Sequence, residues 1–170
     1  MKLKIVEVPD KLLKQKSNKV EFVDNKIKTL IDNMIETMYK DNGVGLSAVQ
    51  VGELLRIVVI DVREGEKDKK NPMVFINPEV IYFSPEKELM EEGCLSVPGQ
   101  HAEIIRSPKV EVKYQDIDMI EKNLKAEGLL AQCLQHEIDH TNGILYIDYL
   151  SKLKRDNLLK KLEKTRKFKK

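Results

Sequence analysis

Cysteine is scarce in this chain, which has 170 residues and only Cys94 and Cys133. Small secreted proteins held by disulfides carry more, so the scarcity favours a reducing cytosol over a disulfide framework. Long apolar runs are missing too, because nothing approaches the roughly 18 consecutive apolar residues of a membrane span. The first eight residues alternate charged and apolar side chains, unlike a secretory signal peptide. We therefore expect a cytoplasmic protein that does not enter a membrane.

The remaining composition is that of a single globular domain. Hydrophobic residues make up 41% and charged residues 34% of the chain, which is ordinary for such a domain. The formal net charge is +2, yet residues 151–170 hold ten Lys or Arg against two acidic residues, a local balance of +8. We expect a catalytic body over residues 1–150 and a basic C-terminal helix over 151–170 in the same domain. Any contact with a polyanion should involve that helix.

The apolar spacing predicts three helices and several strands. Helical intervals extend over residues 24–42, where Gly43 is a natural stop, over 128–140, and from about 151 into the tail. In the last of these, a narrow packing stripe is expected, formed by Leu153, Leu158 and Leu162. Strand-like segments are found at 54–61, 73–77 (ending before Pro78), 80–83, 101–106 and 110–115. The charged stretch 64–71 is expected to be a loop. Strands bracketed by helices indicate an α+β fold.

The strongest functional signal is the sequence His-Glu-Ile-Asp-His at residues 136–140. Histidines four apart on a helix lie on one face, separated by a rise of about 6 Å, so both can bind one metal ion. Glu137, beside the first histidine, can then act as general base toward a metal-activated water. A surface helix could spell this pattern by chance, but the chain has three histidines in all and two of them flank this glutamate. The pattern indicates a metal hydrolase without saying which one.

A third metal ligand would decide the class of hydrolase. In metzincin proteases another histidine follows a glycine after the helix. Here Gly143 is in place, but Tyr146 stands at the histidine position and no methionine follows Met119. Thermolysin-like enzymes use a later glutamate, and the nearby candidate, Glu163, lies among the lysines of the tail. The sequence therefore argues against both the metzincin and the thermolysin-like class of protease. A small zinc endopeptidase that uses this helix remains an alternative.

Each cysteine is a candidate for that third ligand. Cys133 shares a helical stripe with the two histidines, but a metal between them would lie about 7.5 Å of helical rise beyond it. Helical side chains also lean toward the N-terminus, and a zinc–sulfur bond is only about 2.3 Å long. Cys133 is therefore expected to form an apolar wall beside the site. Cys94 is left as the ligand, in a loop where Gly93 permits close backbone approach; the alternative is a small buried apolar residue.

With these residues in view, the chain resembles the peptide deformylase family over nearly its whole length. Three motifs occur in the family's order: Gly-Val-Gly-Leu-Ser-Ala-Val-Gln at 43–50, Glu-Gly-Cys-Leu-Ser at 92–96, and the helix motif at 136–140. The resemblance implies an α+β fold with small mixed or antiparallel β-sheets around a central metal-binding helix, followed by a C-terminal helix. It also implies the activity, which is hydrolytic removal of the N-formyl group from N-formylmethionyl nascent polypeptides with release of formate.

The resemblance further implies roles for individual residues. It makes three residues the metal ligands, namely Cys94, His136 and His140. Glu137 would be the acid/base, while Gln50 and the backbone N–H of Leu95 would stabilise the formyl oxygen as it becomes an oxyanion. Substrate contacts would come from four more residues, namely Val44, Gly45, Leu129 and Cys133. The glycines beside Val44 would let that strand pair with an extended peptide.

One divalent metal ion and few partners are implied. A Cys/His/His site with an open position suits Zn(II) or Fe(II), and the resemblance favours Fe(II) as the active metal, with zinc in purified protein. The substrates would be formylated nascent peptides, and the basic tail suggests docking to the polyanionic ribosome. Neither a membrane nor specific DNA is expected as a partner. A non-enzymatic alternative is a structural metal module whose tail binds nucleic acid, but such a module predicts four ligands where three are visible.

Some residues depart from the family pattern or lie beside the motif. Ser47 stands where Ala is usual, and we expect little effect from it. His101 stands where some members have an Arg near the peptide, and Gln132 stands where the pocket for the first side chain is often apolar. Asp139 is turned about 100° from its neighbouring histidine. We therefore expect Asp139 to pair with Arg106 and not with the metal.

Overall fold

The structure, a computed structural model, describes residues 1–63 and 69–168. The helices are α1 (Asn25–Lys40), α2 (Gly128–Thr141) and α3 (Lys152–Phe168), with short 3-10 turns η1 (Lys11–Lys14), η2 (Ala48–Val51) and η3 (Tyr146–Tyr149). The strands are β1 (Gly45–Ser47), β2 (Ile57–Ile60), β3 (Met73–Phe83), β4 (Glu88–Cys94), β5 (Val97–Arg106), β6 (Lys109–Gln115) and β7 (Glu121–Glu127).

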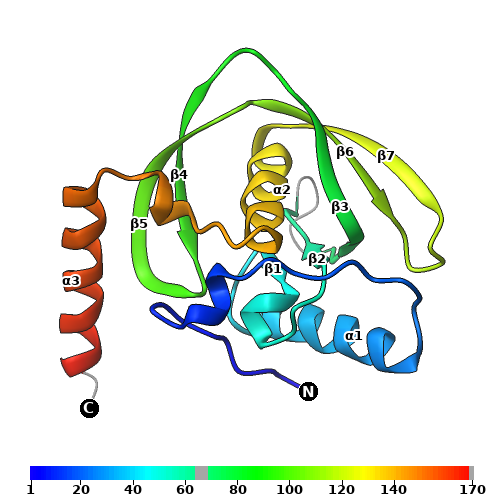
Figure 1. The fold of residues 1–170 in the computed structure, drawn as a ribbon, viewed down its shortest axis with the longest axis horizontal. Helices are drawn as coiled ribbons and strands as arrows, with labels where there is room; N and C mark the ends of the chain where they lie inside the picture. The colour runs from blue at the N-terminus through cyan, green and yellow to red at the C-terminus, as the bar shows by residue number, and fades with distance from the viewer. Residues whose placement is uncertain (64–68, 169–170) are drawn as a thin grey trace.

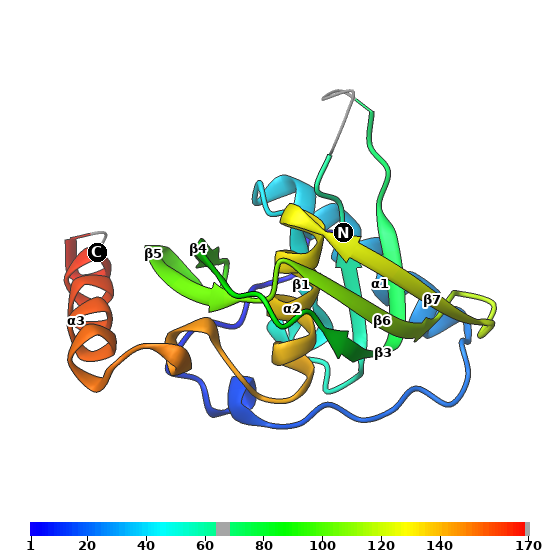
Figure 2. The same ribbon diagram turned by 90° about the horizontal axis from the view of Figure 1, so that it is seen from above.

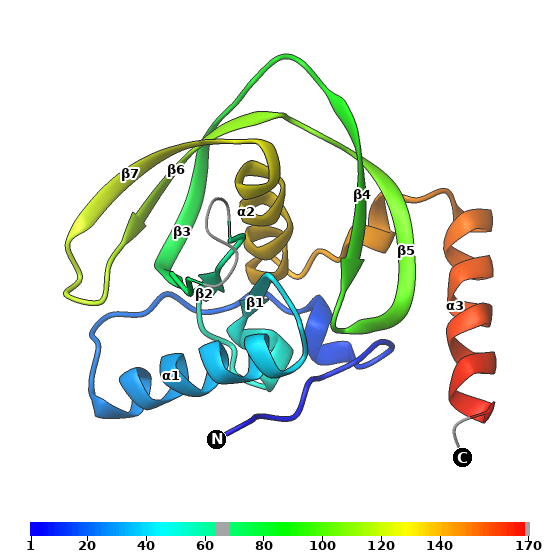
Figure 3. The same ribbon diagram turned by 180° about the vertical axis from the view of Figure 1, so that it is seen from behind.

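Helix α2 lies between two antiparallel sheets, as Figures 1 and 3 show from opposite sides. The larger sheet has five strands in the order β1-β2-β3-β6-β7, and the smaller sheet pairs β4 with β5. The predicted α+β fold is confirmed, because antiparallel sheets surround a central helix that carries His136 and His140. In the part of the chain that the structure describes, no helix combines the length and the apolar character needed to cross a membrane.

The predicted helices are present with small shifts at their ends. Asp24 caps α1, because its side chain accepts a hydrogen bond of 2.9 Å from the Ile27 N–H, which satisfies one of the unpaired donors of the first turn. The predicted packing stripe of α3 is wrong for one of its three leucines. Leu158 and Leu162 are buried, whereas Leu153 is 71% exposed. Five residues separate Leu153 from Leu158, which turns the two side chains about 140° apart on a helix.

Strand prediction was less accurate than helix prediction. The segments 73–77 and 80–83 belong to one strand, β3, so the expectation that Pro78 ends a strand is wrong. Asn77 has a positive φ of 52°, and the pairing of β3 with β6 shifts register between Ile76 and Glu79. This irregularity accommodates the proline, which cannot donate to a regular ladder. Of the predicted loop 64–71, residues 64–68 lie outside the described part.

Three apolar clusters hold the layers together. Helix α1 packs Ile31, Met34 and Met38 against β1 and β2. Helix α2 packs Leu134 and Ile138 against the five-stranded sheet. The third cluster joins α3 to β5, η3 and the N-terminal segment, and it contains Val8, Ile104, Tyr146, Leu158 and Leu162. Figure 2 shows α3 on the outer side of β5, away from α2. The site described next is therefore built mainly on α2, β1, η2 and the end of β4.

Candidate active site

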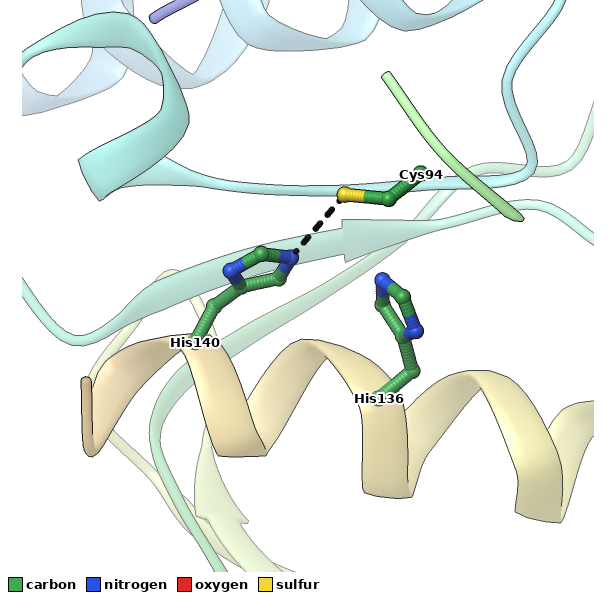
Figure 4. A group of neighbouring side chains, drawn as sticks. All are labelled: Cys94, His136 and His140. Atoms are coloured by element: carbon green, nitrogen blue, oxygen red, sulfur yellow. Dashed lines mark hydrogen bonds between the residues drawn. The ribbon is translucent and has the colours of Figure 1, made fainter. Parts of the chain in front are cut away.

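The side chains of three potential metal ligands, Cys94, His136 and His140, lie close together (Figure 4). Cys94 ends β4, and His136 and His140 lie one turn apart on α2. One ligand atom from each residue lies within 4.8 Å of the others, and Cys94 Sγ is 3.4 Å from His140 Nε2. Both histidines are buried, and Cys94 is half-buried. A thiolate and two imidazoles form a donor set that suits zinc or iron, so these residues fit a metal ion.

The backbone around Cys94 explains how a strand residue reaches the helix. The pairing of β4 with β5 shifts register between Gly93 and Cys94, so that Cys94 is opposite Val97. Such an irregularity in the pairing bends the strand and changes the direction of one side chain. Gly93 leaves room for the neighbouring strand, because a Cβ at that position would lie 2.6 Å from His101 Nδ1 and the imidazole would have to move. The cysteine therefore turns toward α2 at the end of the hairpin.

Glu92 contacts His136 through the ring nitrogen Nδ1. Its Oε1 is 2.8 Å from His136 Nδ1, and Arg106 donates to the same carboxylate from Nε at 2.7 Å and from Nη2 at 2.8 Å. Burial raises the pKa of Glu92, but the hydrogen bonds from Arg106 and His136 outweigh it and lower the pKa to about 2. A carboxylate on Nδ1 orients the ring and leaves Nε2 available for a metal. Sequence reasoning missed Glu92, although residues 92 and 94 share one strand face.

His140 lacks the support that His136 receives from Glu92. It is fully buried, and this burial lowers its pKa well below the ordinary value, with the nearby charge of His136 as a further cause. For His136, burial acts in the same direction, but hydrogen bonds with Cys94 and Glu92 outweigh it and raise the pKa. The neutral imidazole is the form that binds a metal. At His140, burial favours this neutral form.

Glu137 lies beside the ligands and is held from two sides. Its Oε1 is 3.7 Å from His136 Nε2, and its Oε2 is 3.0 Å from the hydroxyl of Ser47. A Cβ on Gly45 would be only 3.0 Å from Glu137 Cγ and 3.3 Å from Oε1, so the absence of a side chain at Gly45 lets β1 approach the carboxylate. Burial raises the pKa of Glu137, and His136 and Ser47 counteract part of that rise. A raised pKa suits a group that must both accept and return a proton.

The side-chain amide of Gln50 lies beside the potential metal ligand Cys94. Its Oε1 accepts a hydrogen bond of 3.0 Å from the Ser47 N–H, which fixes the orientation of the amide. Its Nε2 then donates toward Cys94 Sγ at 3.4 Å and to Ser96 Oγ at 3.1 Å. The side chain is almost completely buried, in η2. The amide group is therefore a fixed donor beside the potential metal ligands.

These groups open into a cleft of about 430 Å³. All the residues expected to contact substrate line it, namely Val44, Gly45, Leu129 and Cys133, together with Gln50, Leu95 and Glu137. His101 and Gln132, two of the departures from the family pattern, line it as well. Gln132 donates a hydrogen bond of 2.7 Å to the main-chain oxygen of Glu91. Its amide thus joins α2 to β4 at one edge of the cleft.

Asp139 points away from the cleft, as the helical geometry predicts. Its Oδ2 accepts a hydrogen bond of 2.7 Å from Arg106 Nη1, so the predicted pair is confirmed. The hydroxyl of Tyr149 donates to the same oxygen at 2.8 Å. Arg106 therefore bridges two carboxylates, Glu92 on β4 and Asp139 on α2.

Comparison with known proteins agrees with this site. Residues 2–156 match the family model described as polypeptide deformylase. A peptide deformylase from Zymomonas mobilis is 54% identical over 169 residues, covering 98% of this chain and 96% of that protein. The crystal structure of peptide deformylase from Ehrlichia chaffeensis has a TM-score of 0.94 at 45% identity, with 99% of each chain covered.

A second structure from Ehrlichia chaffeensis, a peptide deformylase in complex with actinonin, has a TM-score of 0.91 at 47% identity and covers 96% of this chain and 97% of that one. These similarities do not favour the small zinc endopeptidase that the helix motif alone leaves open. The family match spans the three motifs at 43–50, 92–96 and 136–140, which the fold brings to one cleft. This chain belongs to the peptide deformylase family.

Proposed function

We propose that this chain hydrolyses the formamide bond of formylated nascent polypeptides, releasing formate and a free amino terminus. One observation carries the proposal. Glu137 and Gln50 line one cleft together with Cys94 and His136, and His140 lies beside Cys94 to complete the Cys/His/His set. A reacting carbonyl in that cleft would lie within reach of a base, of hydrogen-bond donors and of a metal ion.

Cys94, His136 and His140 would hold one divalent metal ion. Their donor set suits Fe(II) and Zn(II) alike, and the resemblance to the family favours Fe(II) as the active metal. When bound, the ion supplies Lewis-acid chemistry, which polarises a carbonyl and makes water acidic enough to react at neutral pH. Glu92 keeps the His136 ring turned toward that position through its contact with Nδ1.

Glu137 moves the proton in this proposal. Its Oε1 is on the side of His136 Nε2, and there it accepts a proton from the attacking water. After the tetrahedral intermediate has formed, Glu137 gives that proton to the nitrogen of the leaving amine as the carbon–nitrogen bond breaks. Ser47 keeps the second oxygen, Oε2, occupied during both steps. The products are formate and the peptide with a free amino group.

Gln50 and the backbone N–H of Leu95 are the proposed oxyanion donors. The amide of Gln50 is already oriented by its bond to the Ser47 N–H, and one of its two N–H groups, which point toward Cys94 Sγ and Ser96 Oγ, would donate instead to the formyl oxygen as charge develops there. A preorganised donor of this kind contributes about 3 kcal/mol to transition-state stabilisation. Leu95 follows Cys94 directly and lines the cleft.

The peptide would bind along β1. Val44 accepts a hydrogen bond of 2.8 Å from the Asp61 N–H on its β2 side. Because main-chain groups of successive strand residues point to opposite edges, those of Gly45 are directed to the edge that β2 does not occupy. An extended substrate can pair there, with Leu129 and Cys133 beside its first side chain.

The decisive experiment is formate release from a formyl-methionyl peptide by anaerobically prepared, Fe(II)-loaded protein. The matched substrate control is the same peptide with an acetyl group, because the cleft must discriminate the formyl group. Formate release that Glu137→Gln abolishes is the expected result. Cleavage at internal peptide bonds, or a metal-loaded protein that releases no formate, would overturn the proposal.

We further propose that the enzyme works in the cytoplasm and docks on the ribosome through α3. The helix exposes many lysines, namely Lys152, Lys154, Lys160, Lys161, Lys164 and Lys167. A polyanionic surface binds such a helix by counterion release, with a steep dependence on salt. Arg166 is half-buried and donates a hydrogen bond of 2.8 Å to the main-chain oxygen of Val8, so it serves to attach the helix to the body.

A further inference from the structure

A continuous series of polar contacts leads from His136 to a second cavity, lined by Asp139 and Tyr149. It begins with His136 Nδ1 and Glu92 Oε1, 2.8 Å apart, and passes to Arg106, which donates to Glu92 from two nitrogens. Arg106 Nη1 then donates to Asp139 Oδ2 at 2.7 Å. The series ends at Tyr149, whose hydroxyl donates to the same Asp139 oxygen at 2.8 Å.

The two ends of this series line two different cavities. His136 lines the substrate cleft, whereas Asp139 lines a separate cavity of about 490 Å³, together with Arg106 and Tyr149. Tyr149 is not one of the described residues that line the substrate cleft. A change at the Tyr149 hydroxyl would therefore act on the metal site through the residues between them, and not by contact with substrate.

Tyr149 contacts both partners of the outer ion pair. Its hydroxyl binds Asp139, and its ring centroid is 5.0 Å from the central carbon of the Arg106 guanidinium. The Arg106 side chain is buried, and that of Asp139 is 18% exposed. Of the two carboxylates bound to Arg106, Asp139 is therefore the more accessible to water, because the Glu92 side chain is only 2% exposed, and the Tyr149 hydroxyl binds its Oδ2.

We propose that Tyr149 is a positioning residue for the metal ligand His136, acting through Asp139, Arg106 and Glu92. The inference rests on the proposed metal-binding role of His136. A guanidinium is a rigid planar fork, so a bond at Nη1 fixes the plane in which Nε and Nη2 meet Glu92. Glu92 in turn sets the angle of the His136 ring. Groups behind a metal-binding histidine commonly change metal affinity by about 10–100-fold when altered, and Tyr149, which is three contacts further out than Glu92, should have a smaller effect.

The test compares metal loss from zinc-loaded variants challenged with an excess of a chromogenic chelator. Tyr149→Phe keeps the ring over Arg106 and removes the hydroxyl. The zinc should then leave roughly fivefold faster than from the parent protein, the scale of one lost hydrogen bond. Tyr82→Phe is the matched control, because Tyr82 on β3 is also 52% exposed, and its rate should equal that of the parent.

A double variant separates positioning from general stabilisation. If Tyr149 acts through Asp139, adding Tyr149→Phe to Asp139→Asn should accelerate zinc loss no further. The melting temperature of the metal-free Tyr149→Phe protein should match that of the metal-free parent. Zinc loss at the parent rate, or acceleration accompanied by an equal loss of stability in the metal-free protein, would overturn the proposal.

This readout does not depend on catalysis. A parent protein that holds zinc but releases no formate would disprove the proposed function, and the zinc-loss comparison would still decide the role of Tyr149. For an active enzyme, a second readout is available. Because Tyr149 lies away from the cleft, Tyr149→Phe should lower kcat and leave KM unchanged, and a raised KM with unchanged kcat would also contradict the inference.

Discussion

The hydroxyl of Ser47 lies 3.0 Å from Oε2 of Glu137 and 2.8 Å from the Glu137 main-chain oxygen. Ser47 is completely buried, so water cannot replace this contact if it is removed. The sequence alone suggested that a serine would have little effect, because it is nearly as small as the alanine usual in the family. The structure adds a specific partner, the carboxylate proposed to move the proton.

Ser47→Ala should therefore slow turnover without weakening substrate binding. One net hydrogen bond corresponds to about 1 kcal/mol, so we expect kcat to fall roughly fivefold while KM stays constant. Steady-state kinetics on a formyl-methionyl peptide would measure both. Ser84→Ala is the control, since Ser84 is equally buried but lies at the end of β3 beside Lys109. Equal kcat values for parent and Ser47→Ala would show that the hydroxyl has no role.

Glu137→Gln should retain the metal and lose the chemistry. The amide preserves the shape of the side chain and its contact with Ser47, but it cannot accept and return a proton. General acid–base catalysis typically contributes about 10²–10⁴-fold, and kcat should fall by that order. Metal content measured on the same sample checks that the site is intact. A variant with near-parental turnover would remove Glu137 from the proton-transfer role.

The two cysteines should differ sharply in their importance for metal binding. Cys94 Sγ is 3.4 Å from His140 Nε2, whereas Cys133 lies earlier on α2 and packs in the apolar cluster with Leu134 and Ile138. Cys94→Ser should lose most of the bound metal, and Cys133→Ser should keep it. Elemental analysis after gel filtration gives the metal content of each protein. Equal retention in both would exclude Cys94 as a ligand.

Helix α2 and the placement of His136 and His140 on one of its faces could be predicted, because the pattern that identifies them is local. A four-residue spacing fixes two side chains on one helical face, whatever the rest of the fold does. Glu92 was missed as the partner of His136, because pairing between a strand and a helix depends on tertiary placement. Its position two residues before Cys94 was the available signal, since both side chains project from one face of β4.

The strands outside the apolar pattern were the least predictable part of the fold. Strand β7 (Glu121–Glu127) is mostly exposed at the edge of the five-stranded sheet, so burial imposes no alternation on its sequence. Strand β1 has only three residues and begins with Gly45, which reads as a turn from the sequence alone. Pro78 was taken as a strand end, yet the positive φ of Asn77 and the register shift beside it carry β3 past the proline. Such irregularities are set by pairing with β6 and not by propensity.

Stability at acidic pH should depend on Asp61, which follows β2. Burial raises the pKa of this carboxyl, but hydrogen bonds from the Tyr39 hydroxyl and from the N–H groups of Asn71 and Arg63 together lower it below its ordinary value. A carboxyl with a lowered pKa in the folded state stabilises that state above its unfolded pKa of about 3.9. The contribution is lost as pH falls through the folded value.

Asp61→Asn should thus lower the free energy of unfolding by about 2 kcal/mol at pH 7, the scale of hydrogen bonds to a charged group. The difference from the parent should shrink as the pH falls below about 4. This difference in the free energy of unfolding can be measured by urea unfolding at a series of pH values, with equal metal loading of the two proteins. Asp32→Asn, at an exposed position on α1, is the control and should show little difference throughout. A difference in the free energy of unfolding that stays constant down to pH 2 would show that the Asp61 carboxylate does not stabilise the fold in this way.

The proposed ribosome contact can be tested by charge reversal in α3. Lys160, Lys161 and Lys164 are exposed, and changing all three to Glu should leave the packing of Leu158 and Leu162 intact. We expect weaker co-sedimentation with ribosomes at low salt, because fewer counterions are released on binding. The parent protein should lose its own binding as the salt concentration rises. Truncation is a poorer test, since removing Arg166 also removes its bond to Val8.

The matched control for this charge reversal changes three exposed lysines outside α3 to Glu, namely Lys26, Lys28 and Lys125. It alters the net charge of the protein by the same amount, so it separates a contact made by α3 from a general effect of charge. The control should co-sediment nearly as well as the parent, and both variants should keep parental activity on a short formyl-peptide, because none of the six lysines lines the cleft. Binding that salt does not affect, or that both variants lose equally, would exclude α3 as the docking element.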